Sequence, residues 1–331
     1  MPAGHDEEYA RRLDAERRAF ENNTEVHDLP PICHYWLNRY ILPQLSRLGY
    51  ADADSFFIGN LRRAYHRSHL PKRRFVSMGA GNCDTEVRLA HALRESGAED
   101  FIIECLDLNE SMLERGKMAA AASGLAAHIH PVVADLNHWQ PCGTYDAVLA
   151  NQALHHVSSL ETLLDAIRQS LTPHGALIVS EMIGRNGHRR WPEALGPVQQ
   201  FWSELPAQYR YNRQLQRQED QYPDWDCAAD GFEGIRCQDI LPLLLERFRF
   251  QFFYGFSNVT DPFIDRSFGP NFDADKEWDR SFIDRVHAFD EGGIRSGRIK
   301  PTHMLAVLGP DATQQVVCRE HLTPEFCVRW P

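Results

Sequence analysis

The chain has 331 residues, of which 43% are hydrophobic and 24% are charged, and its formal net charge is −11. This composition is close to that of soluble globular proteins, so it excludes a disordered tail protein, a collagen-like fibre and a small disulfide scaffold. The excess of acidic residues gives no electrostatic support for a nucleic-acid partner. No apolar run approaches the roughly 18 residues that are needed to cross a bilayer.

The first twenty residues alternate in charge and lack the apolar stretch of a signal peptide, so they predict a solvent-exposed helix. The eight cysteines are scattered and include no C-x-x-C pair, which favours free thiols in a reducing compartment. The histidines at positions 128, 130 and 138 lack the spacing of metal ligands. We therefore expect a cytoplasmic protein with no metal site and no membrane partner.

Three zones follow one another along the chain. Residues 1–70 carry helical periodicity and many aromatic residues, without a glycine-rich turn. Residues 71–184 alternate short β-branched runs with amphipathic segments, and the remainder returns to helices rich in Trp, Tyr and Arg, with two late strand-like runs. The alternation in the middle zone predicts a parallel sheet with right-handed crossovers.

Small and polar residues follow the predicted strands of this middle zone. We predict strands over 74–78, 101–106, 129–133, 145–150 and 176–180. Gly79 follows the first strand, Asp107 the second, Asp135 the third and Asn151 the fourth. In parallel sheets ligands bind beyond the carboxyl ends of the strands, so these positions predict one shared ligand site.

The residue types at these strand ends favour a ligand that contains adenosine. A glycine-rich turn lets a ligand approach the backbone, and a carboxylate such as Asp107 can accept both hydroxyls of a ribose. A dinucleotide site requires a third glycine where Asp84 stands, and a charge there opposes both the pyrophosphate and close helix packing. NAD is therefore disfavoured.

Five stretches resemble one family in order and spacing: VSMGAGNCD, CLDLNESML, VVADLNHW, YDAVLANQALHHV and LTPHGALIVSEM. Through them, residues 74–184 resemble the class I S-adenosylmethionine (SAM) dependent methyltransferase domain. The resemblance implies an α/β, Rossmann-like, doubly wound and mostly parallel seven-stranded sheet. It also implies an N-terminal helical cover and an inserted helical lid.

The resemblance further implies a SAM site, with S-adenosylhomocysteine as the product. Its implied members are Gly79, Ala80, Gly81, Asp107, Leu108, Asp135, Leu136 and Asn151. The glycine turn would line the methionine part, Asp107 would hold the ribose, Asp135 would meet the adenine edge and Asn151 would lie under the sulfonium. Ser77 stands where many members carry an acidic residue, which weakens the expected contact to the methionine ammonium group.

The later zones resemble a bacterial small-molecule subgroup of this family more loosely, through FEGIRCQDILPLLLERFRFQFFYG, FGPNFDAD and IRSGRIKPTHMLAVLG. In that subgroup a lid follows strand five, and two last strands, here 248–256 and 303–308, close the sheet as a hairpin. The division that follows is an N-terminal cover at 1–70, a SAM-binding core at 71–184, an inserted lid at 185–247, the final strands with a further insertion at 248–310, and a C-terminal tail at 311–331.

Two groups of residues are candidates for contact with the methyl acceptor. His155 and His156 follow the fourth strand, and a neutral histidine there can remove a proton from a hydroxyl nucleophile; the same residues also suit packing at the start of a helix. His34, Tyr35, Arg210 and Tyr211 are the substrate candidates, and each equally suits a helix core or an exposed helix pair.

Together these observations predict a SAM-dependent methyltransferase that acts on an oxygen or nitrogen of a small polar metabolite in biosynthesis, as a monomer or homodimer. The alternative is the same fold with its pocket used for non-methylating chemistry, such as cyclisation, or for regulation by SAM. Fold class does not name the acceptor, because function depends on the site rather than on the scaffold.

Overall fold

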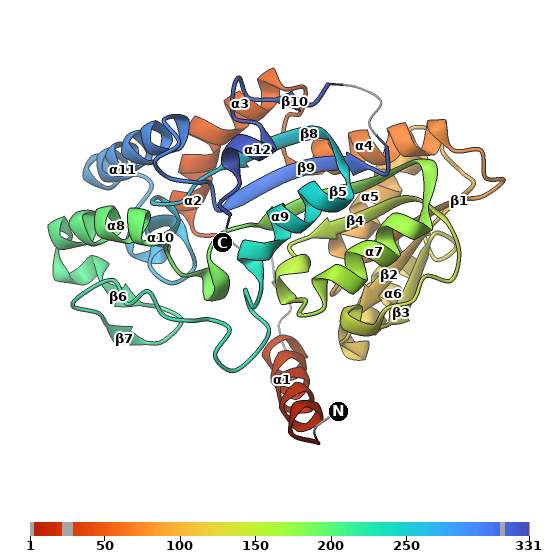
Figure 1. The fold of residues 1–331 in the computed structure, drawn as a ribbon, viewed down its shortest axis with the longest axis horizontal. Helices are drawn as coiled ribbons and strands as arrows, with labels where there is room; N and C mark the ends of the chain where they lie inside the picture. Colours follow the sequence, from red (N-terminus) through yellow and green to blue (C-terminus); the bar gives the residue numbers. More distant parts are fainter. Residues whose placement is uncertain (1–2, 22–28, 312–314, 331) are drawn as a thin grey trace.

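A computed structural model describes residues 3–21, 29–311 and 315–330. Its centre is an eight-stranded sheet in the order β10-β8-β9-β5-β4-β1-β2-β3 (Figure 1). The strands are β1 (Arg73–Met78), β2 (Phe101–Asp107), β3 (Ile129–Val133), β4 (Tyr145–Asn151), β5 (Leu171–Met182), β8 (Arg249–Phe256), β9 (His303–Gly309) and β10 (Val317–Cys318). The predicted Rossmann-like α/β fold is confirmed.

The sheet is parallel except at β9. β1 pairs with β2 and β4, β2 with β3, and β4 with β5, all in parallel, whereas β9 runs antiparallel between β5 and β8. The carboxyl ends of β1 to β5 therefore meet along one edge, as the strand pattern predicts.

The expected number of seven strands was wrong by one. The additional strand, β10, pairs in parallel with β8 through Val317 and Cys318 only, and two residues are too few to show a period in sequence. β5 also begins earlier than predicted, at Leu171, and its register against β4 shifts between Tyr145 and Ala147. The Thr-Pro-His-Gly run at 172–175 lies in this irregular stretch.

Helices cover the sheet because each presents an apolar stripe to it. In α7 the buried apolar residues recur at helical spacing, at Leu160, Leu163, Leu164 and Ile167. Asn109 caps α6 (Glu110–Ala122), since its side chain accepts hydrogen bonds from the amides of Ser111 and Met112. The helices near the sheet are α4 (Ala53–Arg67), α5 (Asp84–Glu95), α6 (Glu110–Ala122), α7 (Leu160–Ser170) and α9 (Cys237–Arg247).

Further helices form the left half of the molecule in Figure 1, away from β1, β2 and β3 at the right. The remaining elements are α1 (Ala3–Glu21), α2 (Pro31–Trp36), the π-helix η1 (Leu37–Ile41), α3 (Leu42–Arg47), the 3-10 turns η2 (Leu136–His138), η3 (Leu154–His156), η4 (Asn186–His188), η5 (Ala207–Tyr209) and η6 (Gly269–Asn271), α8 (Pro192–Glu204), β6 (Tyr211–Asn212), β7 (Arg217–Gln218), α10 (Asp261–Ile264), α11 (Glu277–Arg295) and α12 (Pro324–Cys327). The division into cover, core and lid stays a prediction; α9, inside the predicted lid range, packs against α7.

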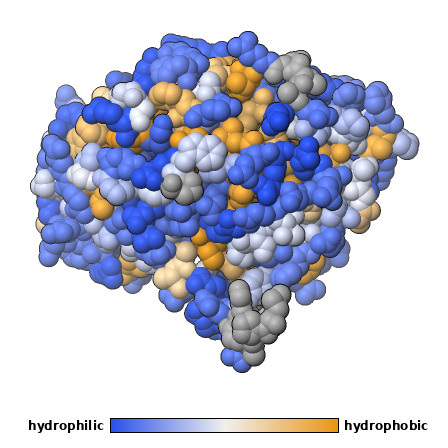
Figure 2. Space-filling view, in the orientation of Figure 1, coloured by the Kyte–Doolittle hydropathy of each residue, from blue (hydrophilic) through white to orange (hydrophobic). Residues whose placement is uncertain are grey.

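Hydrophilic residues dominate the face of the molecule in Figure 2. Over the part of the chain that the structure describes, no helix combines the length and the apolar character that crossing a bilayer requires.

A buried carboxyl group lies under the first strand. Glu86, in the first turn of α5, is 3% exposed, and the Ser77 hydroxyl donates a hydrogen bond to its Oε1 at 2.6 Å. Burial raises the pKa of Glu86 from 4.5 to about 7, because the charged form loses its water. The folded state therefore holds this proton more tightly than the unfolded chain does.

This difference predicts that stability falls as pH rises from about 4.5 to 7. Each tenfold difference in acid dissociation is worth about 1.4 kcal/mol, so the free energy of unfolding should drop by up to about 3 kcal/mol between pH 5 and 8 because of Glu86 alone. Glu86→Gln should remove this part of the slope, measured by urea unfolding across that range. Glu99→Gln, which changes an exposed carboxylate after the same helix, should keep the wild-type slope. An unchanged slope in Glu86→Gln would contradict the assignment.

Candidate functional site

The turn after β1 requires glycine for two reasons. Gly79 and Gly81 have φ values of +64° and +52°, which side chains rarely adopt. A Cβ on Gly79 would lie 2.9 Å from the Cβ of Ala153, in the segment after β4. The turn therefore packs directly against the end of β4, and its backbone remains open to close approach by a ligand.

Asp107, at the end of β2, is held between this turn and α6. Its Oδ2 accepts a hydrogen bond from the Gly81 amide and its Oδ1 accepts one from the Asn109 amide, both at 2.8 Å. A carboxylate offers about four acceptor positions, so each oxygen keeps capacity for one hydroxyl of a ribose. Burial raises the pKa of Asp107, opposed by these amide hydrogen bonds. The residues present fit the ribose of SAM.

Asp135, just after β3, is bound by residues from both sides. Its Oδ1 accepts from the Asn137 amide at 2.9 Å, and its Oδ2 accepts from His138 Nδ1 at 2.8 Å and from the Tyr9 hydroxyl. Burial favours protonation, but the hydrogen bonds from Tyr9 and His138 outweigh it and lower the pKa of Asp135. The predicted adenine-edge carboxylate is therefore ionised and in contact with α1.

Helix α1 lies at the bottom of Figure 1, and its side chains contact residues that follow β3 and β4. Glu16 Oε1 is 2.6 Å from His156 Nδ1, and the Arg12 guanidinium donates to the carbonyls of Ala228 and Gly231 at 2.8 and 2.6 Å. The helix predicted over the first twenty residues thus connects the strand ends with the segment that precedes α9.

His155 is fixed from behind by a buried carboxylate. Its side chain is 4% exposed, and its Nδ1 lies 2.5 Å from Oε1 of Glu181, which is 0% exposed. The other oxygen of Glu181 accepts hydrogen bonds from the amides of Ala153 and Leu154, at 2.9 and 2.6 Å. Glu181, at the end of β5, therefore sets the position of the whole turn after β4.

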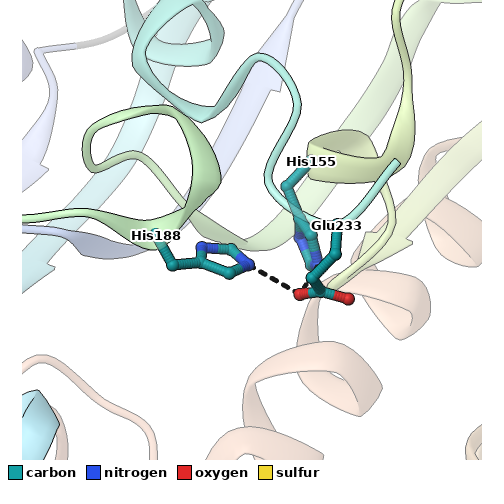
Figure 3. Close-up of side chains that lie close together, drawn as sticks. All are labelled: His155, His188 and Glu233. Carbon is teal, nitrogen blue, oxygen red and sulfur yellow. Dashed lines mark hydrogen bonds and ion pairs between the residues drawn. The ribbon is translucent and has the colours of Figure 1, made fainter. Parts of the chain in front are cut away.

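The other face of His155 meets two residues that are remote in sequence (Figure 3). Glu233 Oε1 lies 3.5 Å from His155 Nε2 and 2.6 Å from His188 Nε2, and Glu233 Oε2 lies 3.6 Å from His156 Nε2. His155 comes from η3, His188 from η4, and Glu233 from the loop before α9. Three separate segments thus converge on one point beyond β4 and β5.

The charges in this cluster compensate one another. Burial opposes the protonation of His155, but the carboxylates of Glu181 and Glu233 outweigh it and raise the pKa of His155 to about 10. Burial lowers the pKa of His188, and the two histidines hold the pKa of Glu233 below its usual range despite its burial. In this state His155 already carries a proton near neutral pH, so it does not accept one from a hydroxyl.

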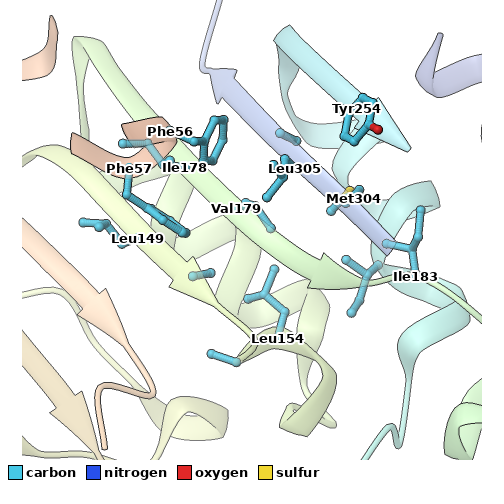
Figure 4. Close-up of a cluster of buried hydrophobic side chains, with 14 of the residues drawn as sticks. Phe56, Phe57, Leu149, Leu154, Ile178, Val179, Ile183, Tyr254, Met304 and Leu305 are labelled. Atoms are coloured by element: carbon cyan, nitrogen blue, oxygen red, sulfur yellow. The ribbon is translucent and has the colours of Figure 1, made fainter. Parts of the chain in front are cut away.

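A hydrophobic cluster supports the turn that carries His155 (Figure 4). Leu154 and Ile183 are 0% and 8% exposed and flank the histidine and Glu181 in sequence. They join a core that includes Phe56 and Phe57 of α4 and Ile178 of β5. Because interiors are close-packed, the polar cluster has little freedom to shift.

The structure separates the sequence-predicted site residues into two groups. Those at the strand ends gather along one edge: Gly79, Ala80, Gly81, Asp107, Leu108, Asp135, Leu136, Asn151, His155 and His156. The substrate candidates lie in the helical half: His34 is exposed on α2, Tyr35 donates to Asp284 of α11, and Arg210, next to Tyr211, donates to the carbonyls of Ser203 and Asp220. Their role stays a prediction.

Sequence reasoning did not identify Glu181, His188 or Glu233. Glu181 directly follows the predicted strand 176–180, so the strand-end rule that selected Asp107 would also have selected it. His188 and Glu233 stand in irregular segments 45 positions apart, and no period or spacing marks them.

A hollow of about 520 Å³ borders the site along β2 and β3. Asp135 and His138 belong to its lining, together with Glu104, His130 and Trp139. Asp135 therefore borders this hollow.

The fold is the Rossmann-like α/β arrangement that the resemblance to class I methyltransferases implies. Residues 76–175 match the family model of the methyltransferase domain. Residues 76–175 thus form a class I SAM-dependent methyltransferase domain, which confirms the resemblance noted for residues 74–184. A search of curated protein sequences found no match to the chain.

Solved structures with similar folds were also found. Geranyl diphosphate methyltransferase in complex with GPP and sinefungin is 14% identical, with 78% of this chain and 77% of that chain covered and a TM-score of 0.42. A putative sarcosine dimethylglycine methyltransferase from Galdieria sulphuraria is 16% identical, with 77% and 84% covered and a TM-score of 0.42. A SAM-dependent methyltransferase from Geobacter sulfurreducens, in complex with S-adenosylhomocysteine, is 14% identical, with 77% and 90% covered and a TM-score of 0.41. Likeness at this level carries no argument about the substrate.

The role of Glu181 as the buried anchor predicts a large loss of stability for Glu181→Gln. The amide keeps the shape, but it removes the charge opposite His155 and replaces one acceptor oxygen with a donor group. Breaking a buried pair of this kind costs about 3–5 kcal/mol, so urea unfolding at pH 7 should show a decrease of about 3 kcal/mol. Glu114→Gln, which breaks the exposed pair with Lys117, should stay within about 0.5 kcal/mol of wild type. Equal stability of the two variants would argue against the anchor.

Proposed function

We propose that this protein transfers a methyl group from SAM to an oxygen or nitrogen of a small polar metabolite. The observation that carries the proposal is the strand-end arrangement of the Gly79–Gly81 turn and Asp107 within a matched methyltransferase domain. The net charge of −11 also suits a cationic sulfonium better than a phosphate-rich polymer.

Each part of this edge has a role in holding the cofactor. The turn at Gly79 and Gly81 lets the methionine part approach the backbone, Asp107 accepts the ribose hydroxyls, and Asp135 faces the adenine edge. When bound, SAM supplies an electrophilic methyl group. Methyl transfer is an in-line displacement, so the contribution of the protein is mainly to position the acceptor and to exclude water.

The acceptor would lie beyond β4 and β5, next to His155 and His156. These residues stand after β4, and Glu181 and the His188 segment stand at the end of β5 and beyond it. The pair of His155 with Glu181 would hold the turn after β4 in place beside the acceptor, which is a positioning role rather than proton removal.

The cofactor part of the proposal predicts that Asp107→Ala weakens SAM binding. The loss of charge-assisted hydrogen bonds to a diol is worth about 1.5–3 kcal/mol, which is about a 10- to 100-fold rise in Kd by calorimetry. Asp107→Asn keeps one acceptor oxygen for the Gly81 amide, so its Kd for SAM should lie between those of wild type and Asp107→Ala. A thermal unfolding temperature close to that of wild type would show that the turn is intact and that only the recognition of SAM is lost. Asp100→Ala changes an exposed carboxylate at the opposite end of β2 and should bind SAM normally. Equal SAM affinity in all variants, or no SAM binding by the wild-type protein, would contradict the proposed cofactor site.

The transfer itself predicts paired products. Incubation of the protein with SAM and a panel of amines, phenols, aliphatic alcohols and carboxylic acids should yield S-adenosylhomocysteine and one methylated acceptor in equal amounts, quantified by mass spectrometry. Asp107→Ala at subsaturating SAM serves as the low-activity control. S-adenosylhomocysteine without a methylated acceptor, or SAM binding without turnover of any member, would favour non-methylating chemistry or regulation instead.

A further inference from the structure

His155, His188 and Glu233 form a cluster that the methyltransferase fold does not require. Each offers one ligand atom, and these atoms lie within 4.8 Å of one another. We propose that the three side chains bind one divalent first-row transition-metal ion, of the Zn²⁺ type, beside the cofactor site. The sequence predicts no metal site, because these ligands come from three separate segments and share no spaced motif.

The donor set suits this class of ion. Two imidazole nitrogens and one carboxylate oxygen are the protein ligands of open zinc sites and of related divalent metals. Metal–ligand bonds of about 2.0–2.2 Å at tetrahedral angles place ligand atoms about 3.3 Å apart. The separation of His155 Nε2 and Glu233 Oε1 is 3.5 Å. The distance between His188 Nε2 and Glu233 Oε1 is 2.6 Å, so it must lengthen by about 0.7 Å to reach the tetrahedral spacing when an ion replaces the shared proton.

The orientation of His155 is that of a metal-binding histidine. Glu181 lies against Nδ1 at 2.5 Å, which directs Nε2 toward Glu233. A carboxylate behind a ligating imidazole is a recurrent arrangement that fixes the tautomer and raises the basicity of the ligand. Behind His188, the Sγ of Cys237 lies 3.7 Å from Nδ1. Both imidazoles thus have a partner on the side away from Glu233.

Hydrogen bonds between backbones hold the three ligand segments together. The Ile235 amide donates to the carbonyl of His155 at 3.1 Å, and the Gly187 amide donates to the carbonyl of Gly234 at 2.8 Å. Gly234 has a φ of +72°, and a Cβ there would lie 3.0 Å from Cε1 of His188. The loop that carries Glu233 is therefore fitted closely against both histidine segments.

A buried arginine adds a further restraint on His188. One guanidinium nitrogen of Arg190 donates to the His188 carbonyl at 3.0 Å, and the other pairs with Asp261 at 2.8 Å. Binding sites need their ligands held by such supporting contacts, because loosely held ligands bind metals weakly. The cluster is therefore already organised for an ion rather than assembled by one.

The location suggests what the ion would do, and this step alone rests on the proposed function. Three protein ligands leave an open coordination position on an ion that stands beyond β4 and β5. An acceptor hydroxyl bound there would release its proton to solvent water more readily, because a divalent cation stabilises the oxyanion that remains. The protonated state of His155 described above would then belong to the metal-free protein.

The test is metal binding by the full chain, measured without SAM. Protein stripped with a chelator should bind one Zn²⁺ by calorimetry and unfold at a higher temperature with Zn²⁺, and Co²⁺ should produce visible d–d absorption. His188→Ala and Glu233→Gln should each weaken Zn²⁺ binding at least about 10-fold, and Glu181→Gln should weaken it about 10- to 100-fold by loss of the partner of His155. His91→Ala, which removes an exposed histidine on α5, should bind as wild type does.

The outcomes separate this inference from the proposed function. Absence of stoichiometric Zn²⁺ binding, or equal affinity in folded His188→Ala and Glu233→Gln, would overturn the metal site and leave the cluster as an ion-pair network, whatever the SAM affinity. Zn²⁺ binding that depends on both ligands supports the site even where no acceptor is methylated. Loss of methyl transfer on chelation, with recovery on Zn²⁺ addition, would show that the metal site takes part in the proposed methyl transfer.

Discussion

The buried carboxylate of Glu181 is the interaction on which the rest of the site depends. It stands at the end of β5, accepts two amide hydrogen bonds from the turn after β4, and contacts the imidazole of His155. A charge in this environment persists only when its acceptor positions are filled. By filling them with the turn after β4, Glu181 couples the ends of two neighbouring strands and thereby fixes the segment that packs against Gly79.

The two halves of the site are built on different principles. The proposed cofactor half uses backbone geometry: a turn with positive φ angles, amides directed at Asp107, and the edge of a parallel sheet. The proposed acceptor half uses side chains from distant segments, held by loops that hydrogen-bond to one another. The first half suits a ligand common to a whole family, whereas the second varies with the loops inserted after the strands.

Helix α1 connects these halves. Tyr9 contacts Asp135 on the cofactor side, and Glu16 contacts His156 on the other. The Tyr9 ring also packs against Phe232 of the loop before α9, at a centroid distance of 5.6 Å, so both polar and aromatic contacts hold α1 in place. A ligand that engages Asp135 would therefore compete with, or rearrange around, the Tyr9 hydroxyl.

The sequence was sufficient to predict the parallel strands of the central zone and the edge where they end. Short apolar runs that end near Gly79, Asp107, Asp135 and Asn151 mark these strands, because period and strand-end chemistry are local properties. Spacing could not reveal the meeting of His188 and Glu233 with His155, since that meeting depends on how loops after β5 and before α9 fold back onto the turn after β4. Long-range packing and hydrogen bonds between loops bring these three residues together. Neither produces a periodic pattern in the sequence.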